Sequence, residues 1–445
     1  MNLQQTMQDR SDALVVFGVT GDLGHDELLP GIVLLHATGR LGVPVIGVAR
    51  TSPTDVDHLI RDTVDPELAA RAGTTIDRIV DEIDLRFIEG DGTDAETWKA
   101  IDAELGDVDL PTVYAALPPQ ILGEVAARLD DSALPDSTRL VLEKPFGHDR
   151  SSASELHEQI IERVGADRLF LVDHFLAKAS IHNLVTFRRS PILDLALRAE
   201  HLDAITVEFP EHDGLEGRGS FYEGVGGVVP DVLQNHLLQT VASALLEPPE
   251  LPEPDALRRA RVELLERVAP IDPANAVIGQ YDGYRDVDDV DDRSTVPTFV
   301  DVGLEIDAPR WKDVPVRVRT GKRVAPGPFE VAWHFAEGPT GIGRSVRARL
   351  KPDAAIHVDL AELDPNTHGA VTSVACTPTD TDHGALDAYA TLLADALVGE
   401  RRHMSSIDEI LESWRIVDPI LRTADDLRRY APGTPVDRVA DPGAR

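Results

Sequence analysis

The sequence predicts a two-domain protein of the α/β plus α+β class. Over residues 14–176, short apolar strands alternate with helix-like segments, a pattern typical of a parallel sheet covered by helices on both faces. From about residue 203 strand-like segments follow one another with few helices between them, which indicates a mostly antiparallel or mixed sheet. We therefore expect a doubly wound, Rossmann-like domain at residues 10–176 and a larger α+β domain at residues 177–445.

The composition is that of a globular protein in a reducing compartment. The chain has 445 residues, of which 42% are hydrophobic and 27% charged. Cys376 is the single cysteine, so no intrachain disulfide is possible. The N-terminal residues are polar, and no apolar run is long enough to span a membrane. We expect a cytoplasmic location.

The net charge of −35 disfavours nucleic acids and anionic membrane surfaces as partners. A small-molecule partner is expected instead, and an anionic one requires positive charge to be concentrated locally. Lysine is scarce, and the whole set is Lys99, Lys144, Lys178, Lys312, Lys322 and Lys351.

The first two strands favour a dinucleotide site. Residues 14–18 read as a buried strand that runs into the turn Gly18-Val-Thr-Gly21-Asp-Leu-Gly24 and then a helix. Glycines at such a junction let the backbone approach a pyrophosphate, although they also serve as simple turn residues. The second strand, residues 43–50, ends in Arg50. An arginine there accommodates the 2′-phosphate of NADP, and a solvated strand-end charge is the alternative.

Four further strands are expected at residues 85–88, 112–116, 139–142 and 169–172. Three of them lead into polar or proline-containing stretches: Leu117-Pro118-Pro119, Glu143-Lys144-Pro145-Phe146-Gly147 and Asp173-His174-Phe175-Leu176-Ala177-Lys178. Ligands of open α/β sheets bind beyond the carboxyl ends of the strands, so we expect the chemistry at these stretches.

The second half contains one long helical stretch among strands. The helix is expected at residues 228–246 and carries Asp231 and His236. Strands are expected at 203–209, 276–280, 298–306, 314–319, 329–334, 346–350, 356–360 and 370–375. Closing helices are expected near 384–398 and 406–428.

Several stretches, in this order, resemble the glucose-6-phosphate dehydrogenase family. In the first half, residues 113–119 resemble the family's VYLALPP, residues 143–147 resemble its EKPFG, and residues 173–178 resemble its D-H-Y-L-G-K. In the second half, residues 216–236 resemble its E-x-R-x-x-Y…D-x-x-Q-N-H, residues 319–322 resemble its R-[TC]-G-K, and residues 412–417 resemble its EAWRIF. The resemblance implies oxidation of C1 of glucose 6-phosphate to the 6-phosphogluconolactone with NADP, or less well NAD, as acceptor. This is the first step of the pentose phosphate pathway. It also implies a homodimer or homotetramer.

The resemblance assigns a role to each candidate residue. It implies that His236 is the general base and Asp173 its carboxylate partner. His174, Lys178 and Lys322 would hold the 6-phosphate, and Lys144, Glu211 and Asp231 the sugar hydroxyls. The cofactor residues would be Gly18, Thr20, Gly21, Asp22, Leu23, Arg50, Ala116, Leu117, Pro118 and Lys144. No metal ligand is expected.

The chain departs from the family pattern where the phosphate is held. Phe175 replaces a tyrosine, Gly327 stands where a basic residue is frequent, and His25-Asp26-Glu27 replaces lysines or arginines. A hydrogen bond to a charged group contributes about 1.5–3 kcal/mol, so two lost contacts could weaken binding about 100-fold or more. Two alternatives therefore stay open: a dehydrogenase of another sugar phosphate or free aldose, and a non-catalytic NADPH-binding paralogue.

Overall fold

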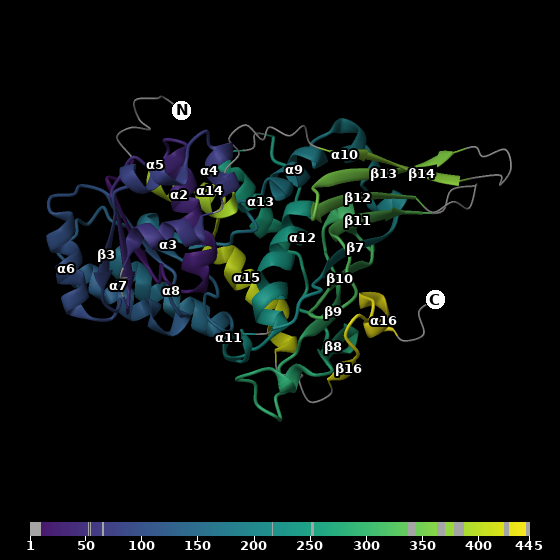
Figure 1. The fold of residues 1–445 in the computed structure, drawn as a ribbon. Helices are drawn as coiled ribbons and strands as arrows, with labels where there is room; N and C mark the ends of the chain where they lie inside the picture. Colours follow the sequence, from purple (N-terminus) through teal and green to yellow (C-terminus); the bar gives the residue numbers. More distant parts are fainter. Residues whose placement is uncertain are drawn as a thin grey trace.

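Two β-sheets, with helices around and between them, make up the protein (Figure 1). In this computed structural model the described residues are 10–441 without 52, 54, 65, 216, 251–252, 337–343, 363–369, 378–386 and 422–426. The architecture confirms the predicted fold class: a doubly wound parallel sheet followed by a large mixed sheet. The division at residue 176 stays a prediction.

The first sheet has the strand order β15-β6-β5-β4-β1-β2-β3. Its six parallel strands are β1 (Ala13–Phe17), β2 (Val45–Ala49), β3 (Leu85–Glu89), β4 (Pro111–Ala115), β5 (Arg139–Leu142) and β6 (Leu169–Val172). They lie at the predicted positions. All residues of β1, β2, β4, β5 and β6 are buried, as expected for parallel strands covered on both faces.

Helices connect these strands. They are a π-helix η1 (Gly24–Leu28) continued by α2 (Leu29–Ala37), then α3 (Val56–Thr63), α4 (Pro66–Arg71), α5 (Ile76–Glu82), α6 (Ala95–Leu105), α7 (Leu122–Asp131) and α8 (Arg150–Val164). Asp149 caps α8, since its side chain accepts from Ser152 N. The helix after the glycine turn was predicted, but its π-helical first turn was not.

The second sheet has nine strands in the order β14-β13-β12-β11-β7-β10-β9-β8-β16. The strands are β7 (Leu202–Pro210), β8 (Ala276–Tyr281), β9 (Phe299–Leu304), β10 (Val316–Gly321), β11 (Phe329–Phe335), β12 (Arg344–Lys351), β13 (Ala355–Glu362), β14 (Ala370–Cys376) and β16 (Arg428–Tyr430). Among the pairings of these described strands, β7–β10 and β16–β8 are parallel and the others are antiparallel. The sheet is therefore mixed.

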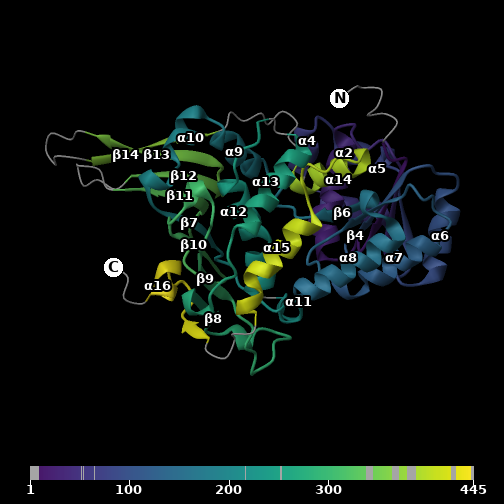
Figure 2. The ribbon, with the colours of Figure 1, turned by 180° about the vertical axis from the view of Figure 1, so that it is seen from behind.

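A layer of helices separates the two sheets in both views (Figures 1 and 2). The helices of this half are α9 (Ala179–Arg188), α10 (Pro191–Ala196), α11 (Gly219–Val225), the π-helix η5 (Val229–Leu237) continued by α12 (Leu238–Leu245), α13 (Pro254–Glu266), α14 (Ala388–Val398), α15 (Ile407–Val417) and α16 (Val436–Ala440). The contacts of α15 with α8, α13 and η5 join the two halves.

The C-terminal part of the chain returns to the first sheet. Strand β15 (Met404–Ser405) pairs antiparallel with β6, and α14 packs on α2. Helix α15 then begins with a capping box formed by Ser406 and Glu409. The predicted 406–428 helix is too long, because α15 ends at Val417 and a 3₁₀ turn follows. Pro419, which has no N–H, cannot continue the α-helical hydrogen bonding. Residues 384–386 and 422–426 of the predicted helices lie outside the described residues.

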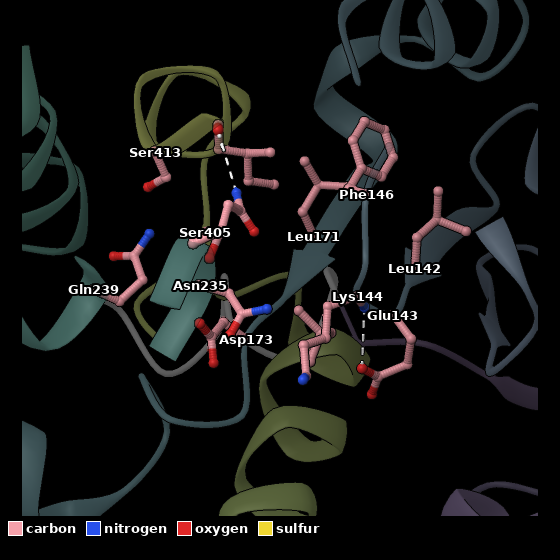
Figure 3. A pocket seen from close by; sticks show the side chains of 13 residues that line it. Leu142, Glu143, Lys144, Phe146, Leu171, Asp173, Asn235, Gln239, Ser405 and Ser413 are labelled. Carbon is pink, nitrogen blue, oxygen red and sulfur yellow. Dashed lines mark hydrogen bonds between the residues drawn. The ribbon is translucent and has the colours of Figure 1, made fainter. Parts of the chain in front are cut away.

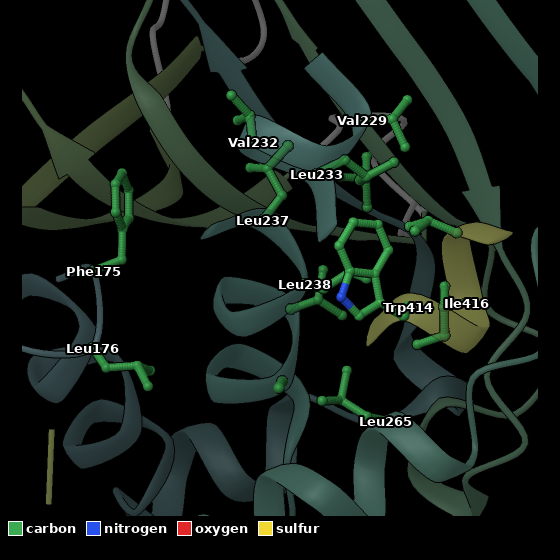
Figure 4. Close-up of a cluster of buried hydrophobic side chains, with 14 of the residues drawn as sticks. Phe175, Leu176, Val229, Val232, Leu233, Leu237, Leu238, Leu265, Trp414 and Ile416 are labelled. Atoms are coloured by element: carbon green, nitrogen blue, oxygen red, sulfur yellow. The ribbon is translucent and has the colours of Figure 1, made fainter. Parts of the chain in front are cut away.

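One continuous hydrophobic core runs through both halves. It includes Val15 of the first sheet, Val207 of the second and the buried Trp414 of α15. Figure 4 shows Trp414 among the leucines of η5 and α12, with Leu265 of α13 beside them. The Trp414 indole donates to Phe146 O at 3.0 Å, which ties α15 to the loop after β5. Across the described ranges, the helices lack the combined length and apolar character needed to cross a bilayer.

Candidate active site

An aspartate and a histidine from the two halves meet at the centre of the molecule. Asp173 follows the last residue of β6, and His236 lies in η5. His236 Nδ1 lies 2.9 Å from Asp173 Oδ1, although the two residues are 63 positions apart in sequence. The same oxygen accepts from Phe175 N at 3.0 Å. Both side chains are buried, with exposed fractions of 5% for His236 and 3% for Asp173.

Burial and charge keep this pair in defined protonation states. Burial lowers the pKa of His236 to about 4, with Lys144 lowering it further and Asp173 opposing the shift. Burial raises the pKa of Asp173, but attraction to His236 outweighs it, and the pKa lies well below the usual range. At neutral pH, Asp173 is therefore a carboxylate and His236 a neutral imidazole. Because Nδ1 faces Asp173, Nε2 is the nitrogen free to accept a proton.

Two lysine–carboxylate pairs lie beside the dyad. Lys144 Nζ is 3.2 Å from Asp231 Oδ1, and Lys322 Nζ is 2.7 Å from Glu211 Oε1. Burial raises the pKa of Asp231, but Lys144 and Lys322 outweigh it and bring the pKa to about 2. Glu211 has a raised pKa because burial outweighs Lys322. The structure thus brings all four of these predicted substrate residues together in two neighbouring pairs.

Lys178 lies against an aromatic ring that also packs on the dyad. Its Nζ lies 4.0 Å from the centroid of the Phe175 ring, which in turn stacks on His236 at 3.9 Å. Lys351, the last residue of β12, brings a second ammonium group close enough to Lys178 to repel its charge. Burial and then Lys351 lower the pKa of Lys178 to about 8. Two ammonium groups held together favour an anion between them.

His174 shares this region but carries no charge. Its ring lies edge-on to His236 at 4.8 Å and stacks on Tyr389 at 5.4 Å. Burial, with His236 as the next cause, lowers the pKa of His174 to about 2. Its buried Nδ1 has no hydrogen-bond partner among the described residues. The imidazole is therefore neutral and can serve only as a neutral hydrogen-bonding group.

The turn after β1 is shaped for close approach. Gly18 has a φ of +76°, and a Cβ there would lie 2.3 Å from Ala116 O. The turn is closed by a hydrogen bond from Gly21 N to Gly18 O at 3.0 Å. Thr20, Gly21 and Asp22 are exposed. Arg50 is exposed at the end of the neighbouring strand β2, as predicted.

A cavity of about 620 Å³ connects this turn with the Lys144–Asp231 pair. Its lining includes the predicted residues Asp22, Leu23, Ala116, Leu117, Pro118, Lys144 and Asp231. This volume lies in the usual range for a small-molecule or cofactor site. The apolar wall of Leu23, Ala116 and Leu117 and the glycine turn fit a bound nicotinamide dinucleotide. The cavity lining does not include four of the predicted cofactor residues, which follow the ends of β1 and β2: Gly18, Thr20, Gly21 and Arg50.

Three residues at the site were not predicted as site residues. Lys351 reaches it from β12, Tyr389 reaches it from α14, and the buried Glu143 lines the cavity next to Lys144. Burial raises the pKa of Glu143 to about 7, with Tyr114 and Lys144 opposing the shift. The scarcity of lysine was the one signal that could have drawn attention to Lys351. Glu216 of the predicted 216–236 stretch lies outside the described residues.

Comparison with known proteins decides the family. The profile "Glucose-6-phosphate dehydrogenase, NAD binding domain" matches residues 15–183, and "Glucose-6-phosphate dehydrogenase, C-terminal domain" matches residues 186–441. The chain belongs to the glucose-6-phosphate dehydrogenase family. Glucose-6-phosphate 1-dehydrogenase 1 of Mycobacterium tuberculosis is 30% identical over 437 residues, which cover 95% of this chain and 92% of that protein. The resemblance inferred from the motifs is confirmed.

Solved structures of glucose-6-phosphate dehydrogenases agree with the whole fold. The enzyme of Mycobacterium avium superposes with a TM-score of 0.83 at 30% identity, covering 96% of this chain and 94% of that one. A glucose-6-phosphate dehydrogenase in complex with its substrate glucose-6-phosphate superposes with a TM-score of 0.85 at 28% identity, covering 98% and 99%.

Proposed function

We propose that the protein is an NADP-dependent glucose-6-phosphate 1-dehydrogenase that oxidises C1 of glucose 6-phosphate to 6-phospho-D-glucono-1,5-lactone. Its family membership supports this activity. The observation that carries the proposal is the 2.9 Å contact between Asp173 and His236 beside the Lys144–Asp231 pair of the cavity. A buried carboxylate–imidazole pair of this kind suits proton abstraction from a hydroxyl group.

Each group of the dyad has a defined task in this reaction. His236 Nε2 takes the proton of the C1 hydroxyl, because Nδ1 is held by Asp173. Asp173 orients the ring and stabilises the imidazolium that forms. NADP, when bound, accepts the hydride that leaves C1. Lys144, Asp231 and Glu211 position the sugar hydroxyls, with Lys144 and Asp231 on the cavity wall.

The cofactor residues proposed from the sequence keep their roles. Gly18, Thr20, Gly21 and Asp22 form the turn for the pyrophosphate, and Arg50 binds the 2′-phosphate that distinguishes NADP from NAD. Leu23, Ala116, Leu117, Pro118 and Lys144 line the cavity beside the nicotinamide half.

The phosphate of the substrate binds at the Lys178–Lys351 pair. The resemblance assigns His174, Lys178 and Lys322 to the phosphate, and of these Lys322 Nζ lies 2.7 Å from Glu211 Oε1. Lys351 supplies a cation that offsets the missing contacts at Phe175 and Gly327. The aromatic cluster of Phe175, Phe209 and Phe329 supports both ammonium groups, since Lys351 Nζ lies 6.0 Å from the Phe209 ring.

The test is an NADPH absorbance assay with purified protein. We expect kcat/KM for glucose 6-phosphate to exceed that for glucose, and NADP to be preferred over NAD. A preference for free glucose or another hexose phosphate would favour the alternative dehydrogenase. Tight NADPH binding without turnover of any sugar phosphate would favour the non-catalytic paralogue.

A cytoplasmic location and a homodimer or homotetramer complete the proposal. The single cysteine and the acidic composition fit the cytoplasm. One relative, 28% identical, is named glucose-6-phosphate 1-dehydrogenase 6, cytoplasmic, of Arabidopsis thaliana. Cell fractionation and light scattering of the purified protein test the two parts.

A further inference from the structure

A second, much smaller cavity lies against Asp173, the carboxylate of the dyad (Figure 3). Its volume is about 30 Å³, and its wall combines the end of β6, the η5–α12 helix and α15. Asp173, Gln239 and Ser413 contribute polar side chains to it, and each is at most 3% exposed. The cavity therefore reaches the carboxylate of the dyad, and it shares Glu143 and Lys144 with the larger cavity.

Three buried oxygens of this lining have no hydrogen-bond partner among the described residues. They are Asp173 Oδ2, Gln239 Oε1 and Ser413 Oγ. Asp173 Oδ1 is used twice, by His236 and by Phe175 N, which leaves Oδ2 as the unsatisfied half of the catalytic carboxylate. Leaving a buried carboxylate oxygen unpaired is costly, so three such atoms around one cavity point to a shared ligand.

A water molecule fits both the volume and the chemistry of this cavity. A buried water needs about 10–15 Å³ and two to four polar partners, and the cavity provides about 30 Å³ and at least the three unpartnered oxygens. The water would donate its two hydrogens to Asp173 Oδ2 and Gln239 Oε1 and accept the hydroxyl hydrogen of Ser413. Each of the three unpartnered oxygens then has a hydrogen-bond partner.

We infer that Gln239 and Ser413 are positioning residues, which hold a buried water against Asp173 Oδ2 and so fix the carboxylate that orients His236. Ser413 stands where the family stretch EAWRIF has alanine. The inference rests on the proposed function only for its effect on turnover, since the water site itself requires no substrate.

The first test is a high-resolution crystal structure of the wild-type protein without substrate. We expect one water within hydrogen-bonding distance of Asp173 Oδ2, Gln239 Oε1 and Ser413 Oγ. A cavity without density, or a sodium or potassium ion in it, would overturn the inference. This result is independent of whether glucose 6-phosphate is the substrate.

The second test compares Ser413→Thr with Ser413→Val, two side chains of nearly equal size that differ in the hydroxyl group. We expect the threonine variant to keep kcat within about twofold and the valine variant to lose about tenfold, with KM for NADP unchanged in both. Equal losses in the two variants would mean that packing alone matters. Ser243→Val is the matched control, because Ser243 Oγ is also buried and unpartnered but lies outside the cavity.

The titration of His236, followed by NMR without substrate, separates positioning from stability. Around His236 the charged or titratable groups are Asp173, Lys144, Asp231 and His174. Without the hydrogen bond to Asp173 Oδ2, the carboxylate stabilises the protonated form of His236 more strongly. We expect the His236 pKa to rise in Ser413→Val and to stay unchanged in Ser413→Thr and Ser243→Val. An unchanged pKa in Ser413→Val would contradict the positioning role.

Discussion

At the residue scale, the dyad depends on two side chains that no local pattern connects. His236 read in isolation is a histidine on an apolar helix face, and it is indeed buried, with Phe175 stacked on its ring. What makes it a catalytic candidate is the carboxylate that reaches it from the other half of the chain. The first prediction concerns this pair.

Replacement His236→Asn keeps a polar side chain of similar shape but removes the proton acceptor. We expect kcat to fall about 100-fold to 10,000-fold, the usual contribution of a general base, with little change in the affinity for NADP. Steady-state kinetics and NADPH fluorescence titration measure the two quantities. A rate within threefold of the wild type would exclude His236 as the base.

The Lys178–Lys351 pair predicts a pH dependence of substrate binding. Lys178, with a pKa lowered to about 8, faces Lys351, Asp173 and Glu27. Its charge is present below this pH and is lost above it, so KM for glucose 6-phosphate should rise above pH 8 while kcat changes less. Replacement Lys351→Met should raise KM at pH 7 about tenfold and move the rise to higher pH, because a repelling neighbour is gone.

The matched control is Lys312→Met, which removes one lysine from an exposed position outside the site. Its KM profile should follow the wild type. If both lysine variants behaved alike, the effect would come from the global charge, and the pairing with Lys178 would have no part in substrate binding.

At the element scale, the turn between β1 and η1 decides how a dinucleotide can approach. In Gly18→Ala the new methyl group would collide with Ala116 O and the residue would adopt a positive φ. We expect weaker NADP binding together with a lower Tm, measured by fluorescence titration and thermal unfolding. Gly39→Ala is the control, because Gly39 has a φ of +70° but no atom within 4 Å of its Cβ position.

The control separates backbone strain from the collision. Gly39→Ala should lower Tm slightly and leave NADP binding unchanged. If Gly18→Ala bound NADP as tightly as the wild type, the glycine turn would be a structural turn only.

Elements with long periodic or apolar patterns could be predicted from the sequence, and short or long-range features could not. The six parallel strands follow from apolar runs such as residues 14–17 and 45–49. Strands β15 and β16, of two and three residues, are too short to leave a pattern and form because a partner strand is present. At the site, the resemblance of residues 173–178 to D-H-Y-L-G-K predicts Lys178, whereas Lys351 is placed only by the pairing of β11 and β12.

At the scale of the whole molecule, the net charge of −35 sets the response to salt. Mutual repulsion of the acidic groups destabilises the compact state and is screened by added ions. We expect Tm to rise with NaCl up to about 1 M and activity to persist there. KM for glucose 6-phosphate should increase, since salt also screens the lysine–phosphate attraction. Sharp inactivation at moderate salt, or a falling Tm, would contradict this account.

The return of residues 388–405 to the first sheet has a consequence for biosynthesis. Strand β15 covers the edge of β6, and α14 covers an apolar surface of α2. A ribosome therefore releases most of the polypeptide before the nucleotide-binding half can acquire its last strand. During that time the edge of β6 in the growing chain is uncovered. In a chain truncated before residue 388, the edge of β6 would stay uncovered permanently.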